Sequence, residues 1–162
     1  TGQPLNAKVG AWATAELAHA TKMWRDIFRG ELIVKDDTAI TAADLDSQHL
    51  ILWGDASSNA VIAKILARKK LPLTWDAQSL TFQGKSYDAA HHAPILIYPN
   101  PLNPEKYVVL NTGIDFRDHG YGSNSLQTPK LPDHAIVDLR EPPGSRWPGR
   151  IVAAGFFDEA WR

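Results

Sequence analysis

Apolar residues near the start of the chain recur at helical spacing. Steps of three or four residues place them on one face of a helix that Gly30 is expected to end. The residues that share this spacing are Ala13, Leu17, Ala20, Trp24 and Ile27. Trp24 is therefore expected to be buried, and truncating it to Ala should cost about 3–5 kcal/mol.

Five short apolar runs are typical of strands. They occupy residues 32–34, 49–53, 95–98, 107–110 and 135–139. The run at 49–53 is continuously apolar, as expected for a parallel strand covered on both faces, so Trp53 is expected to be as buried as Trp24. The loop between the runs at 95–98 and 107–110 is too short for a crossover helix. These two strands are therefore adjacent and antiparallel, or only loosely connected.

Polar signals between these runs predict further elements. Thr41 followed by Asp44 matches a capping box and predicts a short helix. Ser57 or Ser58 can cap a second helix that ends near Lys70. Residues 73–75 and 80–82 alternate, and a turn precedes 86–88, which indicates a hairpin. The predicted fold class is α/β: a three-layer sandwich with a mostly parallel central sheet and a small β-hairpin insertion.

Length and charge limit the classes of protein to which this chain can belong. The chain has 162 residues, so residues 1–162 fit a single α/β domain, and no initiator Met or basic leader opens it. We therefore expect a piece of a longer multidomain chain. A net charge of -1 argues against a nucleic-acid partner, and no apolar run is long enough to span a bilayer, so no membrane partner is expected.

Cysteine content and sequence motifs limit the kinds of catalytic, metal and cofactor sites that the chain can contain. The absence of Cys excludes disulfide scaffolds and thiol catalysis. Adjacent His91 and His92 point in different directions on extended backbone, so no metal site is expected. Neither a dinucleotide fingerprint nor a P-loop is present, so no cofactor is expected. His119, near Asp115 and Asp118, could support acid–base chemistry, but Asp and Gly also form ordinary turns.

Polar clusters follow three of the predicted strands. If these strands were parallel, Asp55, Ser58, Asn100 and Asn111 would converge on one crevice at their carboxyl ends. The candidate ligand-binding residues are Asp55, Ser57, Ser58, Asn59, Asn100, Asn103 and Asn111. Helix capping and a rigid proline-rich connection are the ordinary alternatives. No catalytic residue is expected, because neither serine lies in a Gly-x-Ser-x-Gly elbow.

Several motifs together resemble the region that follows the α/β-hydrolase domain in large bacterial prolyl-oligopeptidase-like proteins. The motifs include Phe28-Arg29-Gly30, Val34-Lys35-Asp36-Asp37-Thr38, Leu52-Trp53-Gly54-Asp55, Tyr98-Pro99-Asn100-Pro101-Leu102-Asn103-Pro104 and Pro129-Lys130-Leu131-Pro132-Asp133. The resemblance covers nearly the whole chain. It implies a bacterial hydrolase as the parent protein, the α/β-hydrolase domain of the same parent chain as partner, and an exported or periplasmic location.

Two functions from different classes follow. The first is a non-catalytic accessory domain of a serine hydrolase of the prolyl-oligopeptidase-like class, contributing interdomain packing or substrate access. The alternative is an autonomous polar-ligand-binding or enzymatic α/β domain with its site at the carboxyl ends of the strands. An accessory domain should expose a large apolar surface, for which Trp147 and Trp161 are candidates, whereas an autonomous domain should not.

Overall fold

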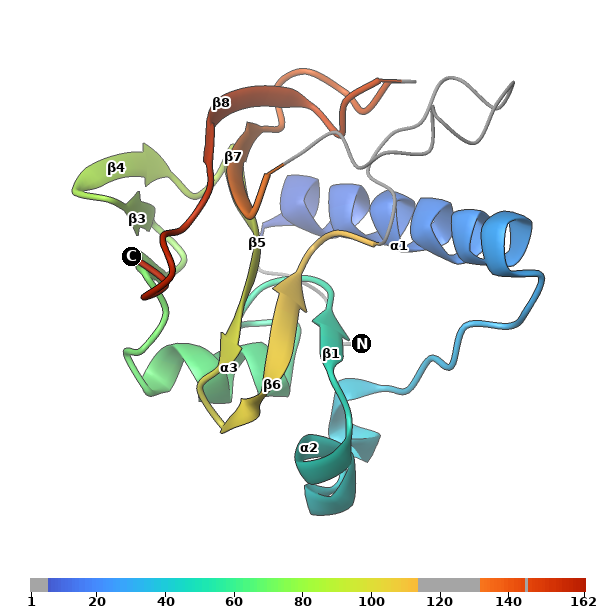
Figure 1. Cartoon of the computed structure of the whole chain (residues 1–162). Helices are drawn as coiled ribbons and strands as arrows, with labels where there is room; N and C mark the ends of the chain where they lie inside the picture. Colours follow the sequence, from blue (N-terminus) through green and yellow to red (C-terminus); the bar gives the residue numbers. More distant parts are fainter. Residues whose placement is uncertain (1–5, 114–131, 145) are drawn as a thin grey trace.

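The computed structural model describes residues 6–113, 132–144 and 146–162 (Figure 1). The helices are α1 (Ala7–Phe28), α2 (Ala42–Ser47) and α3 (Ala60–Ala67), with a 3-10 turn η1 (Asp37–Ala39). The strands are β1 (Leu50–Leu52), β2 (Leu73–Trp75), β3 (Ser79–Phe82), β4 (Lys85–Asp88), β5 (His92–Asn100), β6 (Asn103–Leu110), β7 (His134–Asp138) and β8 (Arg150–Gly155). None of the helices in these ranges is both long and apolar enough to cross a bilayer.

The central sheet is mostly antiparallel, which corrects the fold class expected from the sequence. Its five strands run in the order β1-β6-β5-β7-β8, and only β1 and β6 are parallel. The pairs β5–β6, β5–β7 and β7–β8 are all antiparallel. The predicted three-layer sandwich around a parallel sheet is therefore wrong. Continuous apolar runs arose here because both faces of the sheet are covered, and this burial does not require parallel strands.

The two faces of the central sheet are covered by different elements. Helix α1 packs on one face, where Trp12 and Ala13 join small and branched side chains of β5 and β7. Helix α3 and the smaller sheet pack on the other face, where Ile62, Ile65 and Leu80 lie in the main core. Asn59 caps α3 by accepting hydrogen bonds from the N–H groups of the helix's first turn, a role that we had expected of a neighbouring serine.

The predicted hairpin insertion is a separate three-stranded antiparallel sheet. Its strands follow the order β2-β3-β4, with Trp75 opposite Leu80 and Phe82 opposite Lys85. The alternation of residues 73–75 correctly indicated a strand because one face of this sheet is buried against the core. Trp75 itself is buried.

Two local predictions meet different outcomes in the segment before β1. The capping box is confirmed, because Thr41 and Asp44 exchange hydrogen bonds at the start of α2. Residues 32–34 do not form a strand, and Ile33 is 87% exposed there. An apolar run forms a strand only when it pairs with another strand, and within the described ranges no strand pairs with this segment.

The tryptophans are distributed differently from our expectation. Trp24 and Trp53 are half-buried, so the large loss of stability predicted for their truncation is not supported. Trp12 is buried instead, and its Nε1 donates to the Pro148 carbonyl at 2.6 Å. Helical spacing identified the apolar stripe of α1 but not how far along the helix the sheet extends beneath it.

Candidate functional site

The turn between β1 and α3 contains four of the seven predicted site residues. It begins at Gly54, whose φ of 102° is available to glycine at little cost. A Cβ at this position would lie 2.4 Å from the Ser58 hydroxyl oxygen, so the turn also needs glycine for space. The backbone consequently bends sharply enough for Asp55 to face the following residues.

Asp55 organises this turn with one carboxylate oxygen. Its Oδ1 accepts hydrogen bonds from the backbone N–H and the hydroxyl of both Ser57 and Ser58, at 2.6–3.0 Å. Asn59 accepts from Val61 and Ile62 and donates to the Trp53 carbonyl. Ser58 and Asn59 are buried. These contacts give the polar side chains a structural role at the start of α3.

Asn111 lies at the same end of the strands as this turn, as predicted. Because β1 and β6 are parallel, their carboxyl ends are adjacent, and the Asn111 side chain reaches Gly54. Its Oδ1 accepts from the Gly54 N–H at 2.8 Å, and its Nδ2 donates to the carbonyls of Gly54 and Pro94. The amide is only 1% exposed and all its strong hydrogen-bonding positions are used within the fold. Asn111 therefore joins two strands rather than facing a crevice.

Asn100 and Asn103 lie at the opposite end of the strands. The predicted convergence of Asn100 with Asp55, Ser58 and Asn111 is therefore wrong. Both Asn100 and Asn103 belong to the tight turn between the antiparallel strands β5 and β6. Asn103 donates to the carbonyls of Leu45 and Asp46 at the end of α2. Asn100 is fully buried and its Oδ1 accepts from the Leu102 N–H. The antiparallel pairing separates these residues from Asp55.

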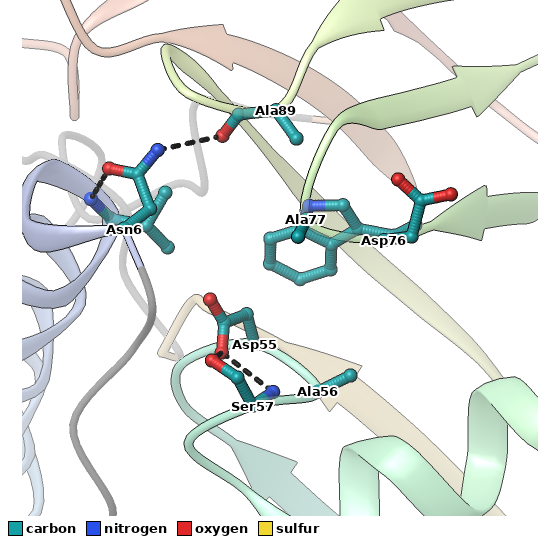
Figure 2. Close-up of a pocket in the computed structure, with 9 residues that line it drawn as sticks. Asn6, Asp55, Ala56, Ser57, Asp76, Ala77 and Ala89 are labelled. Atoms are coloured by element: carbon teal, nitrogen blue, oxygen red, sulfur yellow. Dashed lines mark hydrogen bonds between the residues drawn. The ribbon is translucent and has the colours of Figure 1, made fainter.

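A pocket of about 250 Å³ with a mixed polar and apolar lining lies beside the Asp55 turn (Figure 2). Asp55 and Ser57 form one wall, the start of the smaller sheet at Asp76 forms another, and Asn6 at the beginning of α1 forms a third. Sequence reasoning missed Asn6 and Asp76, because neither belongs to a recognisable motif. The only signal was the tendency of Asn and Asp to form turns, which does not reveal that the three turns meet.

Most polar side chains that line this pocket already form hydrogen bonds to backbone groups around it. Asn6 accepts from two N–H groups of α1 and donates to the Ala89 carbonyl. Asp76 Oδ1 accepts from the backbone N–H groups of Gln78 and Ser79, and these hydrogen bonds hold its pKa below the usual range. The Asp76 carboxylate is therefore charged at neutral pH. A pocket lined by carboxylates and no cationic side chain suits a hydroxyl-rich or cationic molecule better than an anion.

Within the described ranges, no group of three or more metal-ligating side chains comes together. His91 lies in the turn before β5, and His92, in β5, is buried with its Nδ1 2.8 Å from the Asp88 carbonyl. Asp115, Asp118 and His119 lie outside the described residues.

The hydroxyls of the two serines share one acceptor in the described structure, the Asp55 carboxylate, which holds the turn together. Their hydroxyls bond to a carboxylate oxygen that already accepts two backbone N–H groups. We expect that a fluorophosphonate probe will not label the purified chain, because a serine needs a positioned base to react. Gel fluorescence beside a known serine hydrolase checks this. Labelling that disappears in Ser57→Ala or Ser58→Ala would contradict it.

A second, larger cavity lies at the β1 edge of the central sheet. We call it the β1 groove; its volume is about 590 Å³, and its walls are the second half of α1, the extended segment 31–35 and β1. Most of its lining side chains are apolar, including Leu17, Trp24, Ile33 and Ile51. None of the predicted ligand-binding residues except Asn59 contributes to it. Sequence reasoning missed this groove because its residues are separated along the chain.

Comparisons with family models, curated proteins and solved structures found no match to this chain.

Proposed function

We propose that this chain is a non-catalytic accessory domain that docks onto a larger partner through the β1 groove and the apolar side chains around it. The partner is the α/β-hydrolase domain of a prolyl-oligopeptidase-like protein, as the sequence resemblance implies. In this role the chain contributes interdomain packing or limits access of substrate. It does not supply a nucleophile, acid or base.

The observation that carries this proposal is the exposed apolar surface around the groove. Ile33 and Val34 are 87% and 59% exposed, and Phe28 and Ile51 are also exposed. Single apolar side chains on a surface are ordinary, but Ile33, Val34 and Ile51 line one apolar cavity. Phe28 packs against Trp24, which also lines this cavity. Contiguous apolar surface of this kind is typical of a face that another protein covers.

The other apolar surface expected from the sequence has a different arrangement. Trp147 is 46% exposed, as an interaction residue would be. Trp161 packs within the domain against Tyr98, Tyr107 and Phe157, so it is not part of a docking surface. The groove at the β1 edge therefore offers the better-defined interface.

The alternative of an autonomous ligand-binding domain has weaker support. Four of its seven candidate residues, Ser58, Asn59, Asn100 and Asn111, are buried. Asp55 and Ser57 line the pocket beside their turn, yet their hydrogen bonds hold the turn together. An accessory role needs none of these residues to be accessible.

We expect Ile33→Asp to weaken binding of the α/β-hydrolase domain from a prolyl-oligopeptidase-like protein of the same genome by about tenfold or more. A charge placed in the centre of an apolar contact must lose its hydration on binding. Isothermal titration calorimetry with the purified chain measures the change. Because Ile33 is almost fully exposed, the substitution should leave the fold unchanged.

Phe156→Asp is the matched control. Phe156 is 77% exposed but follows β8, at the other edge of the central sheet. We expect this variant to bind as the wild type does. Equal weakening by both substitutions, or no binding of the wild-type chain, would count against docking through the β1 groove.

A further inference from the structure

Among the described residues, strand β1 is an edge strand with one side of its backbone unpaired. Among the described strands its only neighbour is β6, and the Leu52 carbonyl accepts a hydrogen bond from the Asn111 N–H, just after β6, at 2.8 Å. Successive residues of a strand direct their N–H and C=O groups to opposite sides, so the N–H and C=O of Ile51, next to Leu52, face away from β6. No hydrogen bond joins them to other described segments. Such an edge can pair with another strand.

Helix α1 extends past this edge (Figure 1). Its first half packs on β5 and β7 through Trp12 and Ala13, whereas Leu17, Ala20 and Trp24 of its second half line the β1 groove. A helix of 22 residues is about 33 Å long, while neighbouring strands are about 4.8 Å apart. The helix therefore covers the position that a further strand beside β1 would occupy.

The space beneath α1 is apolar and its far side is open to solvent. Trp24 and Phe28 form an edge-to-face pair with ring centroids 4.7 Å apart, and Phe28 is exposed. Segment 31–35 borders the space without pairing with β1. A strand lying here would place alternate side chains against the aromatic pair and bury Ile51, which faces the α1 side of the sheet.

The charged side chains that line the groove all have partners: Asp37 accepts a hydrogen bond from the Ala60 N–H at 2.7 Å, and the others form ion pairs. Lys35 Nζ lies 2.6 Å from Asp44 Oδ1, and Arg25 forms an ion pair with Glu31. These pairs leave little charge to attract an ionic partner. The groove therefore selects an apolar segment, and the unpaired Ile51 backbone requires that this segment be extended.

We propose that an extended apolar strand of the partner adds to β1 beneath the second half of α1 and enlarges the central sheet by one strand. This inference rests on the proposed docking function and names the part of the partner that would bind. Backbone hydrogen bonds to Ile51 would provide affinity, and the apolar contacts with Trp24 and Phe28 would provide selectivity.

Amide hydrogen exchange, followed by NMR on the labelled chain with and without the hydrolase domain, tests the hydrogen bonds directly. We expect exchange of the Ile51 amide to slow at least tenfold on binding. The amides of β8 that face away from β7 serve as the control edge and should not change. Binding without protection of Ile51 would overturn strand addition while leaving the docking function intact.

A synthetic peptide tests strand addition without the hydrolase domain. The probe has five alternating Val and Thr residues between terminal lysines, and its control carries an N-methyl group on every core residue. We expect the probe to bind and to shift the Ile51 amide resonance, and the control, which cannot donate, to bind at least tenfold more weakly. Equal binding of the two peptides, or no binding of either, would overturn the proposal.

Sedimentation velocity of the chain alone tests whether a second copy of the chain, rather than a partner strand, occupies the β1 edge. We expect a monomer whose Ile51 amide exchanges rapidly. A dimer in which Ile51 is protected would show that a second copy occupies the edge, and would overturn the assignment to a partner strand. Peptide binding without hydrolase binding would support strand addition and contradict the docking partner.

Discussion

Replacing Asn111 with Ala is expected to lower the free energy of unfolding by about 3–4 kcal/mol. The side chain makes three hydrogen bonds that connect the end of β6 to the Gly54 turn and to β5. Its removal leaves the buried Gly54 N–H and C=O without these partners. Asn111 also has a φ of 55°, which is more costly for Ala than for Asn. Urea unfolding followed by tryptophan fluorescence measures the loss.

Asn111→Gly separates the two contributions. Glycine accepts the positive φ without strain, so the loss that remains reports the hydrogen bonds. Asn103→Ala is the matched control at the opposite end of the strands. There the Asn103 side-chain amide donates to carbonyls at the less buried end of α2. We expect its effect to be clearly smaller. A change below about 0.5 kcal/mol for Asn111→Ala would contradict the view that these hydrogen bonds stabilise the fold.

Replacing Asp138 with Ala is expected to destabilise the fold by about 3 kcal/mol at neutral pH. The carboxylate lies at the end of β7 with its side chain fully buried, and it accepts hydrogen bonds from Arg140 and Arg150. Both arginine side chains are about half exposed and can regain hydration, which keeps the loss at the lower end of the range for broken buried pairs.

The same carboxylate predicts how stability depends on pH. Hydrogen bonds from Arg140, followed by those from Arg150, hold the Asp138 pKa well below its usual range in the folded protein. Its contribution is therefore complete above the pKa of about 3.9 in the unfolded chain and is lost as the pH falls further. We expect the wild type to lose more stability than Asp138→Ala between pH 7 and pH 3.

Asp76→Ala provides the comparison for this prediction. Asp76 also has a lowered pKa, but its carboxylate is exposed and bonds only to its own turn. We expect a smaller loss at neutral pH than for Asp138→Ala. Parallel pH curves for the wild type and Asp138→Ala would show that the arginine contacts do not stabilise the fold.

Both predictions concern residues that hold strands together, and neither residue lies in the β1 groove. Asn111 was a ligand-binding candidate whose side chain proves to be used within the sheet. The exposed apolar side chains at the β1 edge have no comparable role within the described structure. For this reason we propose that the β1 groove serves the function of the domain, whereas the turn at Asp55 stabilises its fold.

Local elements were predictable from the sequence where neighbouring residues determine them. Thr41 and Asp44 indicated a capped helix because the capping bonds span three residues. The alternation of residues 73–75 and the turn at Gly84 indicated the strands of the smaller sheet for the same reason. The short loop after Tyr98 allowed the antiparallel pairing of β5 and β6, although it did not require it.

The candidate site was only partly predictable. Asp55 and Asn111 were correctly placed near each other, because both follow strands that prove to be parallel. Asn100 was misplaced because its strand runs the other way. Nothing in the order of residues distinguishes an Asn that binds a ligand from one that bonds to a carbonyl distant in sequence.

The sequence by itself determined the helices, most strands, the cap of α2 and the absence of thiol chemistry. Strand direction, the path of α1 past β1 and the open groove beneath it were decided by the tertiary structure alone. Periodicity records which face of an element is buried, and burial is the same against a parallel strand, an antiparallel strand or a helix. The identity of each neighbour depends on contacts between residues far apart in the chain, and those contacts form only when the whole chain packs.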